Sequence, residues 1–115
     1  MKRLKAVLGT GAAALAATAS LLAGAGTAHA DTINGCADGY VCIYADDGTI
    51  VSRYYTYGPH NLSNMYGYHY VLNNQTGGAK VAACTGYNGG DCGTPVGPGW
   101  YWINLTPINS IYLSA

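Results

Sequence analysis

Short stretches of alternating apolar and polar residues, separated by turn residues, make up the chain from residue 31 onward. Residues 40–44 are β-branched or aromatic apart from one cysteine and lie between turn signals, which predicts a strand. The longest predicted strand spans residues 49–57, where side chains alternate between two faces without a helical period. Further strands are predicted at residues 66–72, 79–84, 94–96, 100–105 and 108–113. Short strands with frequent turn signals predict an all-β antiparallel sandwich or small barrel.

Turn-forming residues mark the breaks between these strands. Gly58-Pro59 should end the strand at residues 49–57, and residues 60–65 have the composition of a single helical turn. Residues 73–78 read as a linker that separates two similar halves, at about 36–74 and 79–114. Residues 31–35 form a polar lead-in that we expect to be mobile.

The first thirty residues have the pattern of a secretory signal peptide. A basic start with Lys2, Arg3 and Lys5 precedes an apolar run and the small-x-small cleavage site Ala28-His29-Ala30. A membrane anchor is the alternative, but the run is mostly alanine, glycine and threonine, which are weakly apolar, and no stop-transfer charges follow it. We therefore predict that residues 1–30 are a cleaved signal peptide, that the protein is secreted, and that residues 31–115 form a single domain.

The four cysteines all lie after residue 30, and an exported chain this short usually needs disulfides to supplement its small core. We favour the pairs Cys36–Cys42 and Cys84–Cys92, because both would close short loops that contain glycine. Cross-pairing between the two halves remains open. Zinc is not expected, because the spacings are not C-x₂-C and the predicted compartment is oxidising.

Charge and motif content exclude several functional classes. Residues 31–115 contain five aspartates against Arg53 and Lys80, with no basic patch, which argues against nucleic acid or an anionic membrane as a partner. The two histidines after residue 30, His60 and His69, lack a catalytic motif around them, and no nucleophile or phosphate-loop motif is present. The sequence therefore predicts a protein that is not an enzyme.

One motif carries a resemblance to a known family. The segment Cys36-x-x-Gly39-Tyr40-Val41-Cys42-Ile43-Tyr44 resembles the opening of actinobacterial peptidase inhibitor family I36, and the closing segment 104–111 is similar to stretches of such secreted proteins. The resemblance implies a βγ-crystallin-like fold: two Greek-key halves, each a small antiparallel sheet, packed face to face. It also implies inhibition of a secreted protease, without a cofactor, by a protein that we expect to be a monomer.

Many crystallin-like halves bind calcium, and the corresponding stretches here are residues 65–70 and 105–110. Calcium prefers several oxygen ligands, chiefly carboxylates and carbonyls. The first stretch has no side-chain carboxylate, and the second keeps only Ser110 of the binding motif. We therefore expect no metal or other cofactor.

The segment between the last two cysteines is the candidate inhibitory loop. An inhibitor needs a rigid protruding segment that enters the protease cleft with little ordering cost, and a disulfide-closed loop has that property. Tyr87 is the candidate contact anchor. The loop residues are Cys84, Thr85, Gly86, Tyr87, Asn88, Gly89, Gly90 and Asp91. A structural hairpin closed by a disulfide is the plainer interpretation of the same residues.

A binding module is the alternative function. Aromatic side chains from two predicted strands are candidates for a platform that binds cell-wall glycan or another apolar surface. They are Trp100, Tyr101 and Trp102, with Tyr54, Tyr55 and Tyr57. Strand alternation places Trp100 and Trp102 on one face and Tyr101 on the other, so we expect part of this set to pack in the core.

Overall fold

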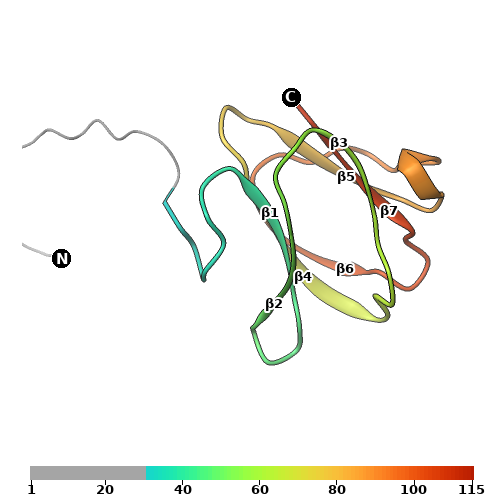
Figure 1. Cartoon of the computed structure of the whole chain (residues 1–115), viewed down its shortest axis with the longest axis horizontal. Coiled ribbons are helices and arrows are strands. Elements are labelled where there is room, and N and C mark those ends of the chain that lie inside the picture. The colour runs from blue at the N-terminus through green and yellow to red at the C-terminus, as the bar shows by residue number, and fades with distance from the viewer. Residues whose placement is uncertain (1–30) are drawn as a thin grey trace, which may run out of the picture.

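The computed structural model describes residues 31–115, and the predicted signal peptide at residues 1–30 lies outside the described part of the chain. Its regular elements are strands and one short 3₁₀ turn, which confirms the all-β class (Figure 1). The elements are β1 (Tyr40–Tyr44), β2 (Ile50–Tyr54), β3 (Gly58–Asn61), β4 (Tyr68–Asn74), β5 (Lys80–Cys84), η2 (Tyr87–Gly89), β6 (Gly99–Asn104) and β7 (Ser110–Ser114).

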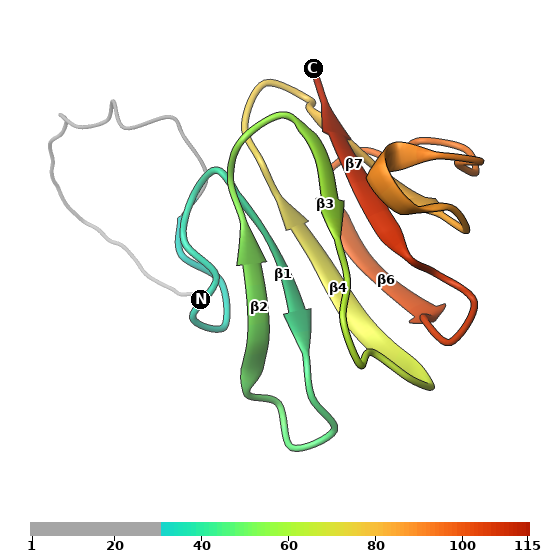
Figure 2. The ribbon, with the colours of Figure 1, turned by 45° about the vertical axis from the view of Figure 1, so that its right-hand side comes forward.

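The strands form two antiparallel sheets, one of four strands in the order β2-β1-β4-β6 and one of three in the order β3-β7-β5. Figure 2 shows the four strands side by side, with β3 and β7 crossing in front of them. The two halves exchange strands. β3, from the first half, pairs with β7, and β6, from the second half, pairs with β4. The expectation that each half forms its own sheet was wrong, because β3 and β6 each belong to the sheet of the other half.

The main core lies between the two sheets. Aliphatic side chains from both sheets meet there, since each strand turns alternate residues inward. Tyr54, Met65, Val96, Ile103 and Ile108 pack around this cluster. Its buried members are Val41, Ile43, Leu62, Val71, Val81, Leu105, Ile111 and Leu113.

A second, smaller cluster lies on the outer face of the four-stranded sheet. Cys36, Cys42, Tyr44 and Leu72 are buried there beneath the segment that precedes β1. The Cys36–Cys42 disulfide joins that segment to β1, as predicted. The Tyr44 hydroxyl lies within hydrogen-bond distance of the carbonyl oxygens of residues 33 and 34, at 3.4 and 3.2 Å.

The lead-in at residues 31–35 is therefore attached rather than free. The Asn74 amide donates to the carbonyl oxygens of Asp31 at 2.8 Å and Cys36 at 3.0 Å. Ile33 and Cys36 also form an isolated antiparallel bridge. The prediction of a mobile lead-in failed because it counted only local polarity, whereas the partners come from strands β1 and β4.

Three predicted boundaries also differ from the structure. The strand at residues 49–57 ends at Tyr54, and the chain then bends into β3, so neither the stop at Gly58-Pro59 nor the helical turn at residues 60–65 occurs. Pro59 is tolerated because β3 lies at a sheet edge, where a missing N–H costs no ladder hydrogen bond. The strand at residues 94–96 is reduced to one bridge between Val96 and Val81.

The segment 73–78 is only partly a linker. Asn73 and Asn74 complete β4, and both are buried together with Gln75. The Asn73 amide donates to the carbonyl oxygens of Ala79 and Val96, and its oxygen accepts from the backbone and side-chain nitrogens of Gln75. Polar composition suggested a solvated connection, but these side chains satisfy backbone groups inside the protein.

Candidate functional site

The segment 84–92 folds into a compact loop closed by the predicted Cys84–Cys92 disulfide, with the two Cα atoms 3.8 Å apart. Within it, η2 forms a short 3₁₀ turn that stands beside β7 in Figure 2. The turn needs left-handed backbone at Asn88 and Gly89, with φ of 55° and 76°. Asparagine and glycine are the residues that adopt this conformation at least cost, so the local sequence specifies the turn.

Side chains from outside the loop fix its position against the second sheet. Asn61 of β3 donates to the Asn88 side-chain oxygen at 3.0 Å and accepts from the Asn88 backbone N–H at 2.7 Å. Asn109 donates to the carbonyl oxygen of Thr85 at 2.7 Å. The loop is therefore anchored at its tip and at its base, in addition to the disulfide.

Ser110 of β7 ties two more loop positions together. Its hydroxyl accepts from the Gly89 N–H at 2.9 Å and donates to the Gly86 carbonyl at 2.7 Å, and the residue is fully buried. Gly89 also packs against the rings of Tyr112 and Pro59, since an added Cβ would lie 2.7 and 3.3 Å from them. These contacts join residues distant in sequence, so local sequence patterns did not indicate them.

Gly89→Ala should destabilise the protein by about 2 kcal/mol, because alanine is strained at positive φ and its methyl would displace the Tyr112 ring. Gly48→Ala is the matched control, since Gly48 has a φ of 87° and open space around it. Denaturant titration of both variants separates the backbone cost from the contact. Equal losses in the two variants would show that the packing of Gly89 on Tyr112 contributes nothing.

The loop presents a side chain rather than an open backbone. The N–H groups of Thr85, Gly86 and Gly90 bond to carbonyl oxygens within the loop, and those of Asn88 and Gly89 bond to Asn61 and Ser110. The Tyr87 side chain, in contrast, is 61% exposed. A partner can therefore contact Tyr87 without competing for the hydrogen bonds that hold the loop.

A second candidate surface covers the outer face of the four-stranded sheet. Tyr68 and Tyr70 of β4 lie beside Trp100 and Trp102 of β6, and the four side chains are 43–56% exposed. The centroid of the Trp102 ring lies 4.5 Å from that of Tyr70 and 5.6 Å from that of Tyr68. The ring centroids of Trp100 and Tyr70 are 6.0 Å apart. We call these four residues the aromatic face.

Only part of the predicted aromatic platform belongs to this face. Trp100 and Trp102 share one side of β6 as predicted, while Tyr101 turns inward and donates to the carbonyl oxygen of Gly97 at 2.7 Å. Tyr54 packs against the main core, and Tyr55 and Tyr57 line a separate hollow, so the predicted grouping of these tyrosines with the tryptophans was wrong. Tyr68 and Tyr70 take their place, because β4 and not β2 pairs with β6.

Two adjoining hollows, of about 320 and 450 Å³, border the aromatic face. Both are lined by Ala45, Asp46, His69 and Trp102, and Asp47 lines the smaller one. We call the two hollows together the aromatic groove. Its carboxylates lie on the turn between β1 and β2, a position that no sequence motif marked as functional.

Hydrogen bonding shapes the acidic rim of the groove. The Thr49 hydroxyl and backbone N–H donate to Asp47 Oδ1 at 2.7 and 3.0 Å. These hydrogen bonds hold the pKa of the Asp47 carboxyl below its ordinary value. Beneath the groove, burial raises the pKa of the Tyr44 phenol, and the positive charge of Arg53 opposes that shift. Asp47 therefore carries a negative charge near neutral pH.

His69 is a structural member of the groove. Its Nδ1 lies 2.7 Å from the Tyr44 carbonyl oxygen and its Nε2 lies 2.9 Å from that of Tyr66. The ring thus connects the end of β1 to the segment before β4. The other histidine, His60, lies in β3 rather than in a turn, with its Nε2 2.8 Å from the Thr56 carbonyl oxygen.

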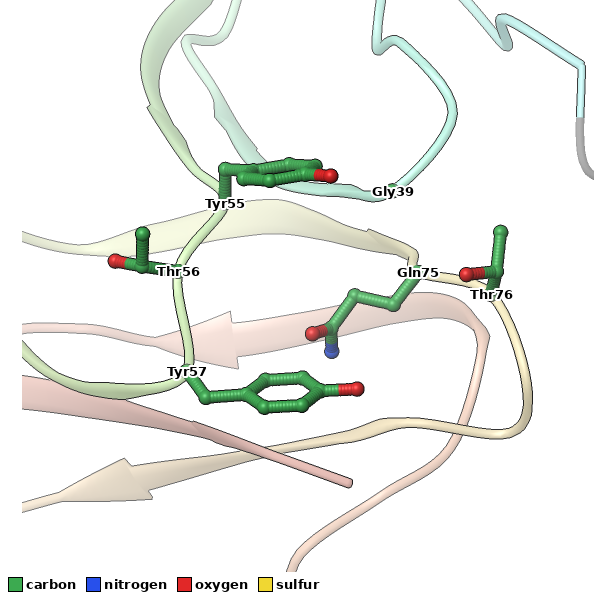
Figure 3. A pocket seen from close by; sticks show the side chains of 6 residues that line it. All are labelled: Gly39, Tyr55, Thr56, Tyr57, Gln75 and Thr76. Atoms are coloured by element: carbon green, nitrogen blue, oxygen red, sulfur yellow. The ribbon is translucent and has the colours of Figure 1, made fainter.

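A third hollow, of about 340 Å³, is lined by Gly39, Tyr55, Thr56, Tyr57, Gln75 and Thr76. Figure 3 shows the Tyr55 ring beside Gly39 and the Gln75 side chain directed toward Tyr57. Gln75 Oε1 is buried without a hydrogen-bond partner among the described residues, while its amide nitrogen donates to Asn73 and to the Lys80 carbonyl. The lining of this third hollow includes no charged residue, whereas the lining of the aromatic groove includes Asp46 and Asp47.

Among residues 31–115, no three histidine, cysteine, aspartate or glutamate side chains gather where they could hold a metal ion. The expectation that the protein binds no calcium therefore still depends on the count of oxygen ligands in the sequence. In the same part of the chain no helix is long and apolar enough to span a membrane.

Comparison with protein-family models, curated proteins and solved structures finds no match to this chain. The resemblance of residues 36–44 to an inhibitor family therefore remains a hypothesis about function.

Proposed function

We propose that the protein is a secreted, non-catalytic inhibitor of extracellular proteases that blocks its target directly with the loop at residues 84–92. The observation that carries this proposal is the anchoring of the loop by Asn61, Asn109 and Ser110 in addition to its disulfide. A loop fixed before binding loses little conformational entropy when it enters a cleft. Two disulfides are also typical of proteins that work outside the cell.

The topology supports a βγ-crystallin-like assignment for the fold. In the first half the fourth strand, β4, returns to lie beside the first, β1, which is the Greek-key connection. In the second half β7 returns beside β5 in the same way. The bridge between Val96 and Val81 takes the place of the second strand. We propose that both halves are Greek keys that exchange their third strands.

An inhibition titration of the oxidised protein tests the proposed activity. A thermolysin-like metalloprotease and a subtilisin-like serine protease are the two targets, because the chain does not indicate the protease class. Stoichiometric inhibition of one enzyme is the expected result. Slow cleavage of the protein, or no effect on either enzyme, would count against the inhibitor proposal for both classes.

Tyr87→Ala should weaken inhibition by about tenfold or more, since an exposed aromatic side chain at the tip of a rigid loop is the strongest candidate anchor. The melting temperature should change little, because the side chain makes few contacts within the protein. Tyr57→Ala is the matched control, with the same exposed fraction of 61% at a position outside the loop. Equal inhibition by Tyr87→Ala and the unmodified protein would remove Tyr87 from the contact.

A second function, non-catalytic binding of a partner through the aromatic face, is favoured by one specific observation. Four adjoining tyrosine and tryptophan rings are exposed on one sheet face and border a groove. Exposed aromatic patches of this kind mark interaction surfaces in proteins that otherwise bury such side chains. Binding to insoluble peptidoglycan or chitin tests the glycan form of this function.

A further inference from the structure

The aromatic groove combines two features that recognise positive charge. Trp102 and Tyr70 present partly exposed rings at its floor, and the electron-rich faces of such rings attract ammonium and guanidinium groups. Asp46 and Asp47 line the same hollow with carboxylates. A cation placed there gains from the rings and from the carboxylates together.

No lysine or arginine side chain balances the carboxylates of the groove. The lysine and arginine of residues 31–115 are Lys80 and Arg53, and neither lines either hollow. The one basic side chain that lines both hollows is His69, whose ring nitrogens face the carbonyl oxygens of Tyr44 and Tyr66. Lys80 belongs to β5 of the opposite sheet. Arg53 lies on β2, exposed, where its charge is felt by Tyr44. The groove therefore keeps a negative rim over an apolar floor.

We propose that the aromatic groove binds a basic segment of a partner polypeptide by receiving lysine or arginine side chains between Trp102 and the carboxylates of Asp46 and Asp47. This inference rests on the second proposed function and identifies the ligand of that surface. The two hollows adjoin along Trp102 and share Asp46, so an extended segment can place one basic side chain on each side of the indole.

A neutral glycan is the competing occupant. Sugar rings would stack on the aromatic face, but the negative charge of the two carboxylates would add nothing to their affinity. A basic peptide gains from that charge, and complementary charge also speeds association and confers specificity. Charge complementarity therefore favours the basic segment over the glycan.

Intrinsic fluorescence reports this groove selectively, because both tryptophans of the chain lie in it. The oxidised protein should show a saturable fluorescence change with tetralysine or tetra-arginine and none with tetraglutamate. The affinity should fall with added salt, because exposed charges are screened. A tetramer of N-acetylglucosamine should neither bind nor compete.

Two variants locate the site. Trp102→Ala should weaken peptide binding by about tenfold, which Trp100 fluorescence still reports. Asp46→Asn with Asp47→Asn should weaken binding by about fivefold and remove most of its salt dependence. Tyr57→Ala and Asp31→Asn are an aromatic control and an aspartate control outside the groove, and both should bind normally.

Each outcome decides between specific alternatives. Saturable binding of the sugar tetramer without binding of tetralysine would overturn the basic-segment proposal and keep the binding-module function. Failure of every probe would overturn both. Equal binding of tetralysine by the Asp46→Asn/Asp47→Asn protein would show that the carboxylates do not recognise the ligand. The protease titration tests the inhibitor proposal, and its result does not depend on any of these outcomes.

Discussion

Removal of the Cys84–Cys92 disulfide should lower the free energy of unfolding by about 2–3 kcal/mol and weaken protease inhibition. The loss of stability follows from loop-closure entropy, which is modest for a sequence separation of 8. The loss of inhibition follows because hydrogen bonds alone would then hold the turn, so the loop around Tyr87 would lose more conformational entropy on binding. Cys84→Ala with Cys92→Ser is the suitable variant, since Cys84 is buried and Cys92 is exposed. Denaturant titration and inhibition assays measure the two effects.

The second disulfide provides the matched control. Cys36→Ala with Cys42→Ala removes a bond of similar loop length, and both of its cysteines are buried on the outer face of the four-stranded sheet. This variant should lose at least as much stability and still inhibit, provided that it is assayed where it is folded. Normal inhibition by the Cys84→Ala/Cys92→Ser protein would show that the loop at residues 84–92 is not the inhibitory element.

Asn73→Ala should destabilise the protein by about 3–5 kcal/mol, among the largest effects expected of a single substitution. The Asn73 side chain is 1% exposed and makes hydrogen bonds to Ala79, Val96 and both nitrogens of Gln75, at 3.0–3.2 Å. Alanine would leave the Ala79 carbonyl oxygen and the Gln75 backbone N–H without their side-chain partner. The Val96 carbonyl and the Gln75 side-chain nitrogen would each lose one of two hydrogen bonds and keep the other, to Val81 and Lys80. Chemical denaturation monitored by tryptophan fluorescence measures the loss.

Asn104→Ala is the control for that substitution. The Asn104 side chain is exposed and accepts one hydrogen bond, from the Thr106 backbone at 3.2 Å. Its loss should cost no more than about 1 kcal/mol, because water replaces the missing partner. Similar losses for the two asparagine variants would contradict the structural role given to Asn73.

The contrast between the two asparagines shows that local sequence patterns did not predict which polar side chains are buried. Asn73 lies in the polar stretch at residues 73–78 that predicted a linker, whereas Asn104 lies in the strand predicted at residues 100–105. Asn73 pairs with Val41 of β1 and Gly99 of β6, and its amide donates to the carbonyl oxygens of Ala79 and Val96, which lie next to β5 and in the bridge to β5. No local pattern carries that information, since the partners of Asn73 come from outside its strand.

Each candidate site likewise contains residues that the sequence predicted and residues that only the structure identified. Residues 84–92 were recognised from sequence because cysteines, glycines and an asparagine specify a closed turn locally. The partners that fix this turn, Asn61 and Ser110, were not. The aromatic face was half recognised, through the alternation of Trp100 and Trp102. Its other half, Tyr68 and Tyr70, depended on knowing that β4 pairs with β6.

The sequence by itself determined the all-β class and favoured the observed pairing of the cysteines, because strand alternation, turn residues and short disulfide loops are local properties. The tertiary structure alone decided which strands are neighbours. It placed β3 and β6 in the opposite sheets, buried Asn73, and brought Asp46 beside Trp102. These outcomes depend on long-range register, which is set by packing of the whole core rather than by any one segment.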